Sequence, residues 1–360
     1  MSKKDLDLGQ KLRLRTILFL QGYWSPIEVE LSQYENGAGA LTRASLTDLD
    51  VLGVRYDQLF TAHRIVGDCK AGRHVSDANR LFWLKGVMSY FGADQAYFLR
   101  PVISSHVRAM SPKLGVRVVS DAELTALEQA LGADKIKIPV GDQTIYEEMD
   151  GLWGIDVPDG HKPTQDQLKF KQVYSLLSYT YWFHDPRRNL LYLLDAFESI
   201  ADLLDPADRT HVLLVFTGAE RFAHCLLEAA AFIQSQGLGE IARYARIYVH
   251  GGAMELRDKE RFFELLRQLT AGQEQLDPPW LRDVTELLAR LMRNPSGAYD
   301  ILRHLTVMYI WCAHLEHHTL PPINGGSANT AAIVLAKDVI KTFVRATGMP
   351  EAMFESVRDL

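Results

Sequence analysis

The segment Leu46-Thr47-Asp48-Leu49-Asp50-Val51-Leu52-Gly53-Val54 is followed, after a short gap, by Arg64-Ile65-Val66-Gly67-Asp68-Cys69-Lys70. Both segments are rich in apolar and β-branched residues, which favours a β-strand for each. Because side chains alternate along a strand, Asp68 and Lys70 share one face. Asp48 and Asp50 share a face for the same reason. If the two strands pair, Asp50 and Asp68 converge, with Lys70 beside them.

This pattern has a chemical interpretation. Charged residues within apolar strands are costly unless they are paired or bind a metal. Hydrolysis of a phosphodiester needs a cation to neutralise the phosphoryl oxygens, a positioned water and a group that stabilises developing charge. Mg²⁺ suits this task because it takes carboxylate oxygens in octahedral geometry and keeps several waters. We therefore interpret Asp50 and Asp68 as candidate metal ligands and Lys70 as a candidate catalytic residue.

The flanking residues give the motif a context. An acidic residue followed two positions later by lysine occurs by chance in a chain of this composition, so the triplet alone is weak. Here it ends a predicted strand and follows a predicted helix and two further strands. The predicted elements are helix 6–20, strands 27–31, 46–54 and 64–70, helix 77–91, strand 95–99, helix 102–110, strand 115–119 and helix 121–131. This order predicts an α/β sandwich with one central sheet.

The remainder of the chain differs in composition. Residues 133–165 contain many Gly and Pro and little periodicity, so we interpret them as a linker between domains 1–132 and 166–360. Beyond residue 166 the apolar spacing is mostly helical. Two short runs, His211 to Phe216 and Ile247 to His250, are consistent with strands or with buried helix. The large apolar faces are most simply a core, and a partner or oligomer surface is the alternative.

Composition limits the class of protein. The 360 residues are 47% hydrophobic and 23% charged, which is ordinary for a globular protein, and their number favours two domains. The net charge of −6 counts against indiscriminate binding to nucleic acid, so contacts with DNA would depend on local basic patches. The three cysteines lie far apart, and no secretory signal or membrane helix is recognisable. We expect a cytoplasmic protein with no membrane partner.

Residues 1–132 resemble the PD-(D/E)xK nuclease superfamily and, within it, the Mrr-type restriction endonuclease and Holliday-resolvase-like branch. The segments that carry the resemblance are Gln21-Gly22-Tyr23, Asp50, Asp68-Cys69-Lys70 and the stretch from Ile103-Ser104-Ser105-His106 to Gly115–Leu124. The resemblance implies a restriction-endonuclease-like αβββαβ core followed by a mostly helical domain. It also implies a DNA endonuclease that depends on Mg²⁺, for which Mn²⁺ can substitute. Asp50 and Asp68 would be its metal ligands and Lys70 its catalytic lysine.

One feature departs from that family. Many members place a glutamate in the first helix, whereas this helix has no Glu and offers only Asp5, Asp7 and Gln10. Glu28 or Glu30 on the first strand is a candidate replacement. Glu30 on the first strand and Asp48 on the second are additional acidic candidates for the site.

Several alternatives stay open. Asp48 or Asp50 could cap a turn or pair with Arg55 or Arg64. Arg73, Arg80 and Lys85 are candidate phosphate-binding residues, and a solvated helix face is the alternative. Lys11, Arg13 and Arg15 on the basic side of the first helix have the same two interpretations.

The rival function is a catalytically inactive nuclease fold that binds nucleic acid or scaffolds a complex. Cleavage of RNA stays open. Prokaryotic restriction or anti-phage defence rests on analogy alone, and the helical domain is expected to bind the substrate, a protein partner or a second copy.

Overall fold

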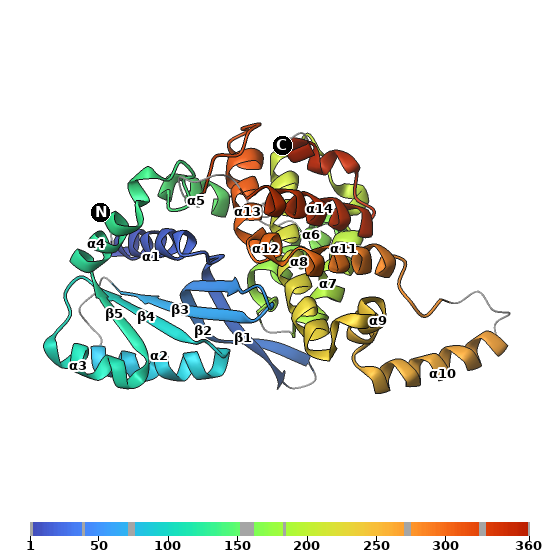
Figure 1. The fold of residues 1–360 in the computed structure, drawn as a ribbon, viewed down its shortest axis with the longest axis horizontal. Helices are drawn as coiled ribbons and strands as arrows, with labels where there is room; N and C mark the ends of the chain where they lie inside the picture. Colours follow the sequence, from blue (N-terminus) through green and yellow to red (C-terminus); the bar gives the residue numbers. More distant parts are fainter. Residues whose placement is uncertain are drawn as a thin grey trace.

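The computed structural model describes residues 3–37, 40–70, 76–151, 162–182, 185–269, 275–323 and 329–358. The first part of the chain forms a mixed sheet of five strands in the order β1-β2-β3-β4-β5 (Figure 1). Its strands are β1 (Ile27–Gly37), β2 (Ala40–Tyr56), β3 (Ala62–Cys69), β4 (Gln95–Arg100) and β5 (Val116–Ser120). Its helices are α1 (Lys3–Leu20), α2 (Asp77–Phe91), α3 (Ser105–Leu114) and α4 (Asp121–Leu131). The predicted α/β class with one central sheet is confirmed.

The sheet combines two kinds of pairing. Strands β1, β2 and β3 pair antiparallel, whereas β3, β4 and β5 pair parallel, with α2 and α3 as the crossovers. The β2–β3 register pairs Val51 with Gly67, so Asp50 and Asp68 occupy the next positions on the two strands. The backbone N–H of Lys70 donates to Leu99 O at 3.2 Å and extends the ladder one residue beyond β3.

Helices cover both faces of the sheet (Figure 1). α1 and α4 pack on one face, and α2 and α3 pack on the other. α1 approaches closely because β3 carries a glycine beneath it: a β-carbon on Gly67 would lie 2.6 Å from Leu14 Cδ2. The Ser76 side chain caps the start of α2, and Ser120 and Glu123 form the predicted capping box of α4. These helix starts follow the sequence signals.

The predicted linker contains ordered structure. α5 (Gln143–Gly151) lies within it, and its first turn is capped by Asp142 Oδ1, which accepts from the backbone N–H of Ile145 at 3.0 Å. Met149 of this helix is buried. A helix of nine residues carries too few apolar positions to stand out among the glycines and prolines around it. Residues 152–161 lie outside the described part, and the boundaries of the linker stay predictions.

The rest of the chain is mostly helical, as predicted. Its helices are α6 (Gln165–Ser175), α7 (Pro186–Glu198), α8 (Arg209–Gln236), α9 (Ile241–His250), α10 (Ala253–Leu269), α11 (Leu281–Arg293), α12 (Pro295–Ala298), α13 (Ile301–Val307), α14 (Thr330–Ala346) and α15 (Glu355–Arg358), with π-helical segments η2 (Leu176–Thr180) and η5 (Met308–His314). The two runs left open as strand or helix belong to α8 and α9. α8 is buried along most of its length, so its apolar residues show no single face.

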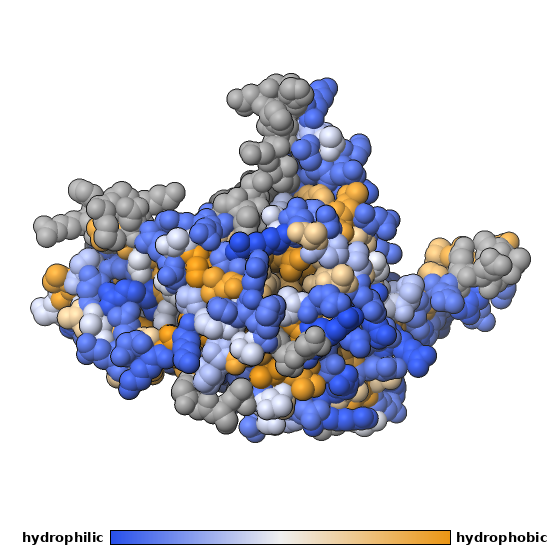
Figure 2. All heavy atoms as spheres, turned by 90° about the horizontal axis from the view of Figure 1, so that it is seen from above, coloured by the Kyte–Doolittle hydropathy of each residue, from blue (hydrophilic) through white to orange (hydrophobic). Residues whose placement is uncertain are grey.

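One apolar helix face is not part of the core. α10 extends away from the other helices (Figures 1 and 2). Phe262, Leu265 and Leu269 on this helix are 58%, 59% and 82% exposed. The prediction that the apolar faces form a core is therefore wrong for this helix, and the alternative of a partner or oligomer surface stays a prediction. None of the helices in the described segments is long and apolar enough to span a membrane.

Polar side chains join the sheet to the helical part. Glu228 on α8 accepts hydrogen bonds from Tyr56 Oη of β2 at 2.5 Å and from Arg64 Nη2 of β3 at 2.8 Å. One turn earlier on α8, His224 is 5% exposed and its Nδ1 lies 2.6 Å from Tyr181 Oη. The two Glu228 contacts hold α8 against the ends of β2 and β3 that lie away from Asp50 and Asp68.

The acid stability of the protein should depend on His224. Burial lowers the pKa of this imidazole to about 4, with nearby Arg64 and Arg221 acting in the same direction and Glu228 opposing them. A lowered folded-state pKa stabilises the fold fully above the unfolded pKa of about 6.5, and this contribution is lost as the pH falls towards 4. The loss amounts to about 3 kcal/mol. Between pH 6.5 and 4, His224→Gln should therefore show a flatter dependence of unfolding free energy on pH.

Chemical denaturation at a series of pH values measures this slope. The exposed His106→Gln on α3 is the matched control and should retain the wild-type slope. Equal slopes for wild type and His224→Gln would show that His224 does not stay neutral in the folded state.

Candidate active site

Two buried carboxylates meet on adjacent strands of the sheet. Asp50 on β2 and Asp68 on β3 are 1% and 2% exposed. Lys70 Nζ lies 3.0 Å from Asp50 Oδ2 and 3.6 Å from Asp68 Oδ1. The backbone N–H of Cys69 donates to Asp50 Oδ2 at 2.7 Å, while its side chain is fully buried. The structure thus brings together Asp50, Asp68 and Lys70, the three residues that the strand pattern predicts to converge.

A second lysine belongs to this cluster. Lys11 Nζ, from α1, lies 2.8 Å from Asp50 Oδ1 and 2.6 Å from Glu28 Oε1. In the sequence Lys11 was only one of the basic residues of an amphipathic helix. Its spacing from Asp50 carries no signal, because the contact depends on how closely α1 packs on the sheet.

Glu28 has an unusual backbone conformation. Its φ is +55°, in the left-handed region that residues other than glycine rarely adopt. Such a conformation costs about 1–3 kcal/mol and persists only where surrounding contacts impose it. Of the two strand glutamates considered as replacements, Glu28 reaches the site through Lys11. Glu30 lies in register with Asp48 on β2, and both line a neighbouring cavity.

Arg80 binds one of the carboxylates directly. Its Nε and Nη2 donate to Asp68 Oδ2 and Oδ1, both at 2.7 Å, and its guanidinium lies 3.5 Å from the centre of the Trp83 ring. The predicted phosphate-binding residue is therefore at the site but engaged with Asp68. Arg73, a second candidate, lies outside the described residues.

Lys85 lies away from the carboxylates. A β-carbon on Gly115 would be 4.0 Å from Lys85 Nζ, and Gly115 precedes β5. Val118, three residues further on, is the β5 residue level with Asp68 across the parallel strands. Three residues span about 10 Å along a strand. Lys85 is therefore not beside Asp68, and its role in binding a phosphate of the substrate stays a prediction.

A buried ion pair supports the backbone of Lys70. Arg100 at the end of β4 is 5% exposed, and its Nε donates to Asp77 Oδ1 at 2.8 Å. Its Nη1 donates to the carbonyl oxygen of Lys70 at 3.2 Å. This bond holds the backbone of Lys70 one residue beyond the end of β3.

The charges of the site act on each other. Burial raises the pKa of Asp50, but Lys11 and Lys70 outweigh it, so the pKa of Asp50 is lowered. At Asp68 burial outweighs the Arg80 guanidinium, and the pKa of Asp68 is raised. Burial would lower the pKa of Lys70, but Asp50 and Asp68 raise it above its ordinary value. The cluster contains equal numbers of acidic and basic side chains, namely Glu28, Asp50, Asp68, Lys11, Lys70 and Arg80.

The donor set fits a hard divalent cation. Asp50 Oδ1 is buried and lies 2.8 Å from Lys11 Nζ, which occupies one of its lone pairs and leaves the other for a cation. Within the described part of the chain, no group of three or more His, Cys, Asp or Glu side chains is placed to hold a metal. Mg²⁺ needs only one or two carboxylates because it keeps water ligands. A site with Asp50 and Asp68 therefore matches Mg²⁺ or Mn²⁺.

Comparison of the chain with protein-family models, with curated proteins and with solved structures gave no match.

Proposed function

We propose that this chain is a metal-dependent nuclease of the PD-(D/E)xK type that hydrolyses phosphodiester bonds in DNA. One observation carries the proposal: Asp50 and Asp68, both buried, lie on adjacent strands with Lys70 Nζ within 3.0 and 3.6 Å of their oxygens. Two carboxylates and a lysine at the end of paired strands are the minimal set for metal-assisted hydrolysis of a phosphodiester. The nuclease-like unit would comprise residues 1–132.

Each side chain has a proposed role. Asp50 and Asp68 hold Mg²⁺, which when bound neutralises phosphoryl oxygens and makes its water more acidic. Lys70 lies beside both carboxylates, where its ammonium group can hydrogen-bond the attacking water and stabilise negative charge in the transition state. Arg100 positions Lys70 through the carbonyl bond described above. Lys11 keeps Asp50 ionised.

Arg80 does not block metal binding by Asp68. A carboxylate has about four lone-pair positions, and a bidentate arginine occupies one on each oxygen. The remaining positions of Asp68 stay available to a cation. Arg80 then balances the buried charge when no metal is bound, and it lies next to the position where a phosphate would approach.

The helical part is proposed to bind the substrate, a protein partner or a second copy of the chain. The exposed apolar face of α10 is the surface that suits protein contacts. Because the net charge is −6, contacts with DNA would be local to the basic side chains around the site. RNA is a further candidate substrate. Restriction or anti-phage defence in a prokaryote is the proposed setting, by analogy only.

A non-catalytic role is the second candidate function. The observation in its favour is Lys11, a cation on Asp50 that comes from the helix where many nucleases of this type carry a glutamate. An ammonium group there could replace the metal permanently. The protein would then bind nucleic acid or scaffold a complex without cleaving it.

Plasmid cleavage separates the two functions. Purified protein is incubated with supercoiled plasmid in Mg²⁺, Mn²⁺ or EDTA, and binding of the same DNA is followed by gel shift. We expect nicked or linear products with either metal and none in EDTA. A gel shift without cleavage in both metals would support the non-catalytic function instead.

A further inference from the structure

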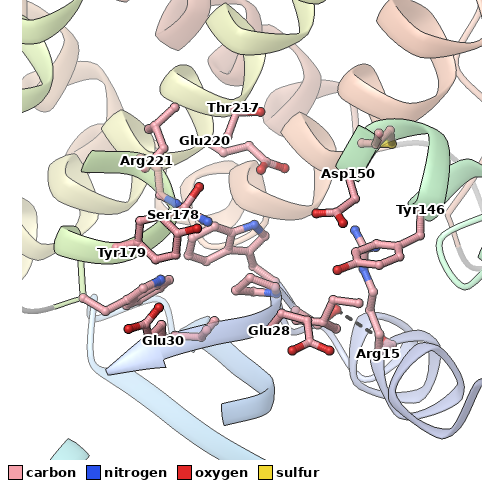
Figure 3. Close-up of a pocket in the computed structure, with 18 of the residues that line it drawn as sticks. Arg15, Glu28, Glu30, Tyr146, Asp150, Ser178, Tyr179, Thr217, Glu220 and Arg221 are labelled. Atoms are coloured by element: carbon pink, nitrogen blue, oxygen red, sulfur yellow. Dashed lines mark hydrogen bonds between the residues drawn. The ribbon is translucent and has the colours of Figure 1, made fainter. Parts of the chain in front are cut away.

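A cavity of about 800 Å³ lies between the sheet and the helical part, next to the site described above (Figure 3). Its walls come from the helices α1, α5, α6, α8 and α13, the π-helical segments η2 and η5, and the strands β1 and β2. In Figure 3, Arg15 and Tyr146 lie on one side of it, Arg221 and Tyr179 on the other, and Glu28 below. A volume of this size accommodates a small organic ligand.

Two arginines line the cavity with unused hydrogen-bond donors. Arg15 Nε and both Nε and Nη1 of Arg221 are buried nitrogen atoms that have no acceptor among the described residues. Burial lowers the pKa of both guanidinium groups. A buried donor without an acceptor is costly, and such groups usually mark a missing ligand, ion or water.

The buried charges near these arginines do not cancel. Glu220 is the acidic neighbour of both guanidinium groups; it is 8% exposed and accepts a hydrogen bond from Thr306 Oγ1 at 2.6 Å. Glu220 is the one buried acid among the described residues that line the cavity, so two arginines face one buried carboxylate. The other carboxylates that line the cavity, here called the rim carboxylates, are more accessible: Glu28, Asp48 and Asp150 are exposed and Glu30 is half-buried. The interior therefore suits an anionic group, and the rim suits hydrogen-bond donors.

Aromatic rings form much of the remaining wall. Arg221 lies over Trp24 and Trp182, with 4.7 and 5.2 Å to the ring centres, which fixes its guanidinium at the cavity wall. The tyrosines that also line the cavity are Tyr146, Tyr174, Tyr179 and Tyr309. Flat aromatic walls favour a ligand that contains a ring.

We propose that this cavity binds a nucleotide. One guanidinium group would donate hydrogen bonds to the phosphate, and the other would donate to acceptor atoms of the base. The rim carboxylates would accept hydrogen bonds from ribose hydroxyls and exocyclic amines. The acidic rim disfavours a long polyanion, so a free nucleotide is the favoured source and the phosphorylated end of a strand is the other. This proposal is independent of the nuclease proposal. Arg15 and Lys11 are one helical turn apart on α1, so the ligand would lie next to Asp50.

Isothermal titration calorimetry in EDTA tests the proposal, because cleavage cannot occur there. The probes are the four common nucleoside monophosphates, the corresponding nucleosides, inorganic phosphate and a 5′-phosphorylated oligonucleotide. We expect at least one monophosphate to bind about tenfold or more tightly than its nucleoside and than phosphate. Stronger binding of the oligonucleotide would assign the site to a strand end. The proposal would be overturned if nucleoside and nucleotide bound with equal affinity, if inorganic phosphate alone bound, or if no probe bound.

Variants locate the binding. Arg15→Gln and Arg221→Lys should each weaken the best probe about tenfold or more, and Arg282→Gln on the surface of α11 should not change it. Because a buried arginine variant can fail to fold, Ser178→Trp provides a second route: this residue is exposed at the cavity, and the larger side chain would fill it. Unchanged affinity in Ser178→Trp and in a folded arginine variant would place the ligand elsewhere and overturn the proposal.

Discussion

Asp68→Asn should lower the rate of metal-dependent DNA cleavage by a factor of about 10³ or more. An amide carries no charge to attract a divalent cation, and its nitrogen would point at either Arg80 or the metal. Mn²⁺ binding, measured by electron paramagnetic resonance, should fall with the rate. The substitution nearly preserves volume, so the fold should persist, which circular dichroism verifies.

Lys70→Met should separate binding from catalysis. The ammonium group contacts the carboxylates without being a metal ligand, so Mn²⁺ binding should remain or strengthen while cleavage falls by a factor of about 10²–10³. Asp283→Asn, an exposed acid on α11, is the matched control for Asp68 and should cleave like wild type. If both site variants cleave like this control, the cluster is not the catalytic centre.

Arg80→Met should destabilise the protein by about 3–5 kcal/mol in EDTA. The variant leaves Asp68, which is 2% exposed, without its bidentate partner. A buried carboxylate that loses its closest counter-charge costs more than the pair contributed, because Lys70 at 3.6 Å compensates its desolvation only in part. The loss should appear as a lower denaturant midpoint with little change in slope.

Mg²⁺ should restore part of that stability. A ligand that binds only the folded state stabilises it in proportion to the logarithm of its concentration, and Mg²⁺ would replace the missing positive charge beside Asp68. Arg282→Met, whose parent side chain is 86% exposed, should show neither the loss nor the recovery. Destabilisation of Arg80→Met to the same extent in Mg²⁺ and EDTA would indicate a purely structural ion pair.

Local sequence patterns predicted the strands and helices that carry the site. Alternating and β-branched residues mark the strands, and the capping residues Ser76 and Ser120 mark helix starts, because both depend on neighbours in sequence. The antiparallel β2–β3 pair then brings Asp50 and Asp68 together as their positions implied. The exact strand lengths were underestimated, since β1 and β2 extend towards each other as a long hairpin.

Contacts set by packing could not be predicted. Lys11 reaches both Asp50 and Glu28 only because α1 lies close above the glycine of β3, and no spacing rule connects these positions. The left-handed φ of Glu28 likewise has no signal in its residue type. The cavity depends on how α8 and η5 pack against β1. This packing places Arg15 and Arg221, which are 206 positions apart in the sequence, in the wall of one cavity. The exposure of the α10 face also required knowing that no described helix packs over it.

The central claim is that Asp50 and Asp68 form a metal-dependent site for phosphodiester hydrolysis. The most direct measurement adds Mg²⁺ to EDTA-treated wild-type protein in excess over an end-labelled DNA duplex and follows the strands on a denaturing gel. We expect no products before the addition and cleaved strands after it, with none from Asp68→Asn. Intact strands in Mg²⁺ and in Mn²⁺, or products that form equally in EDTA, would contradict the claim.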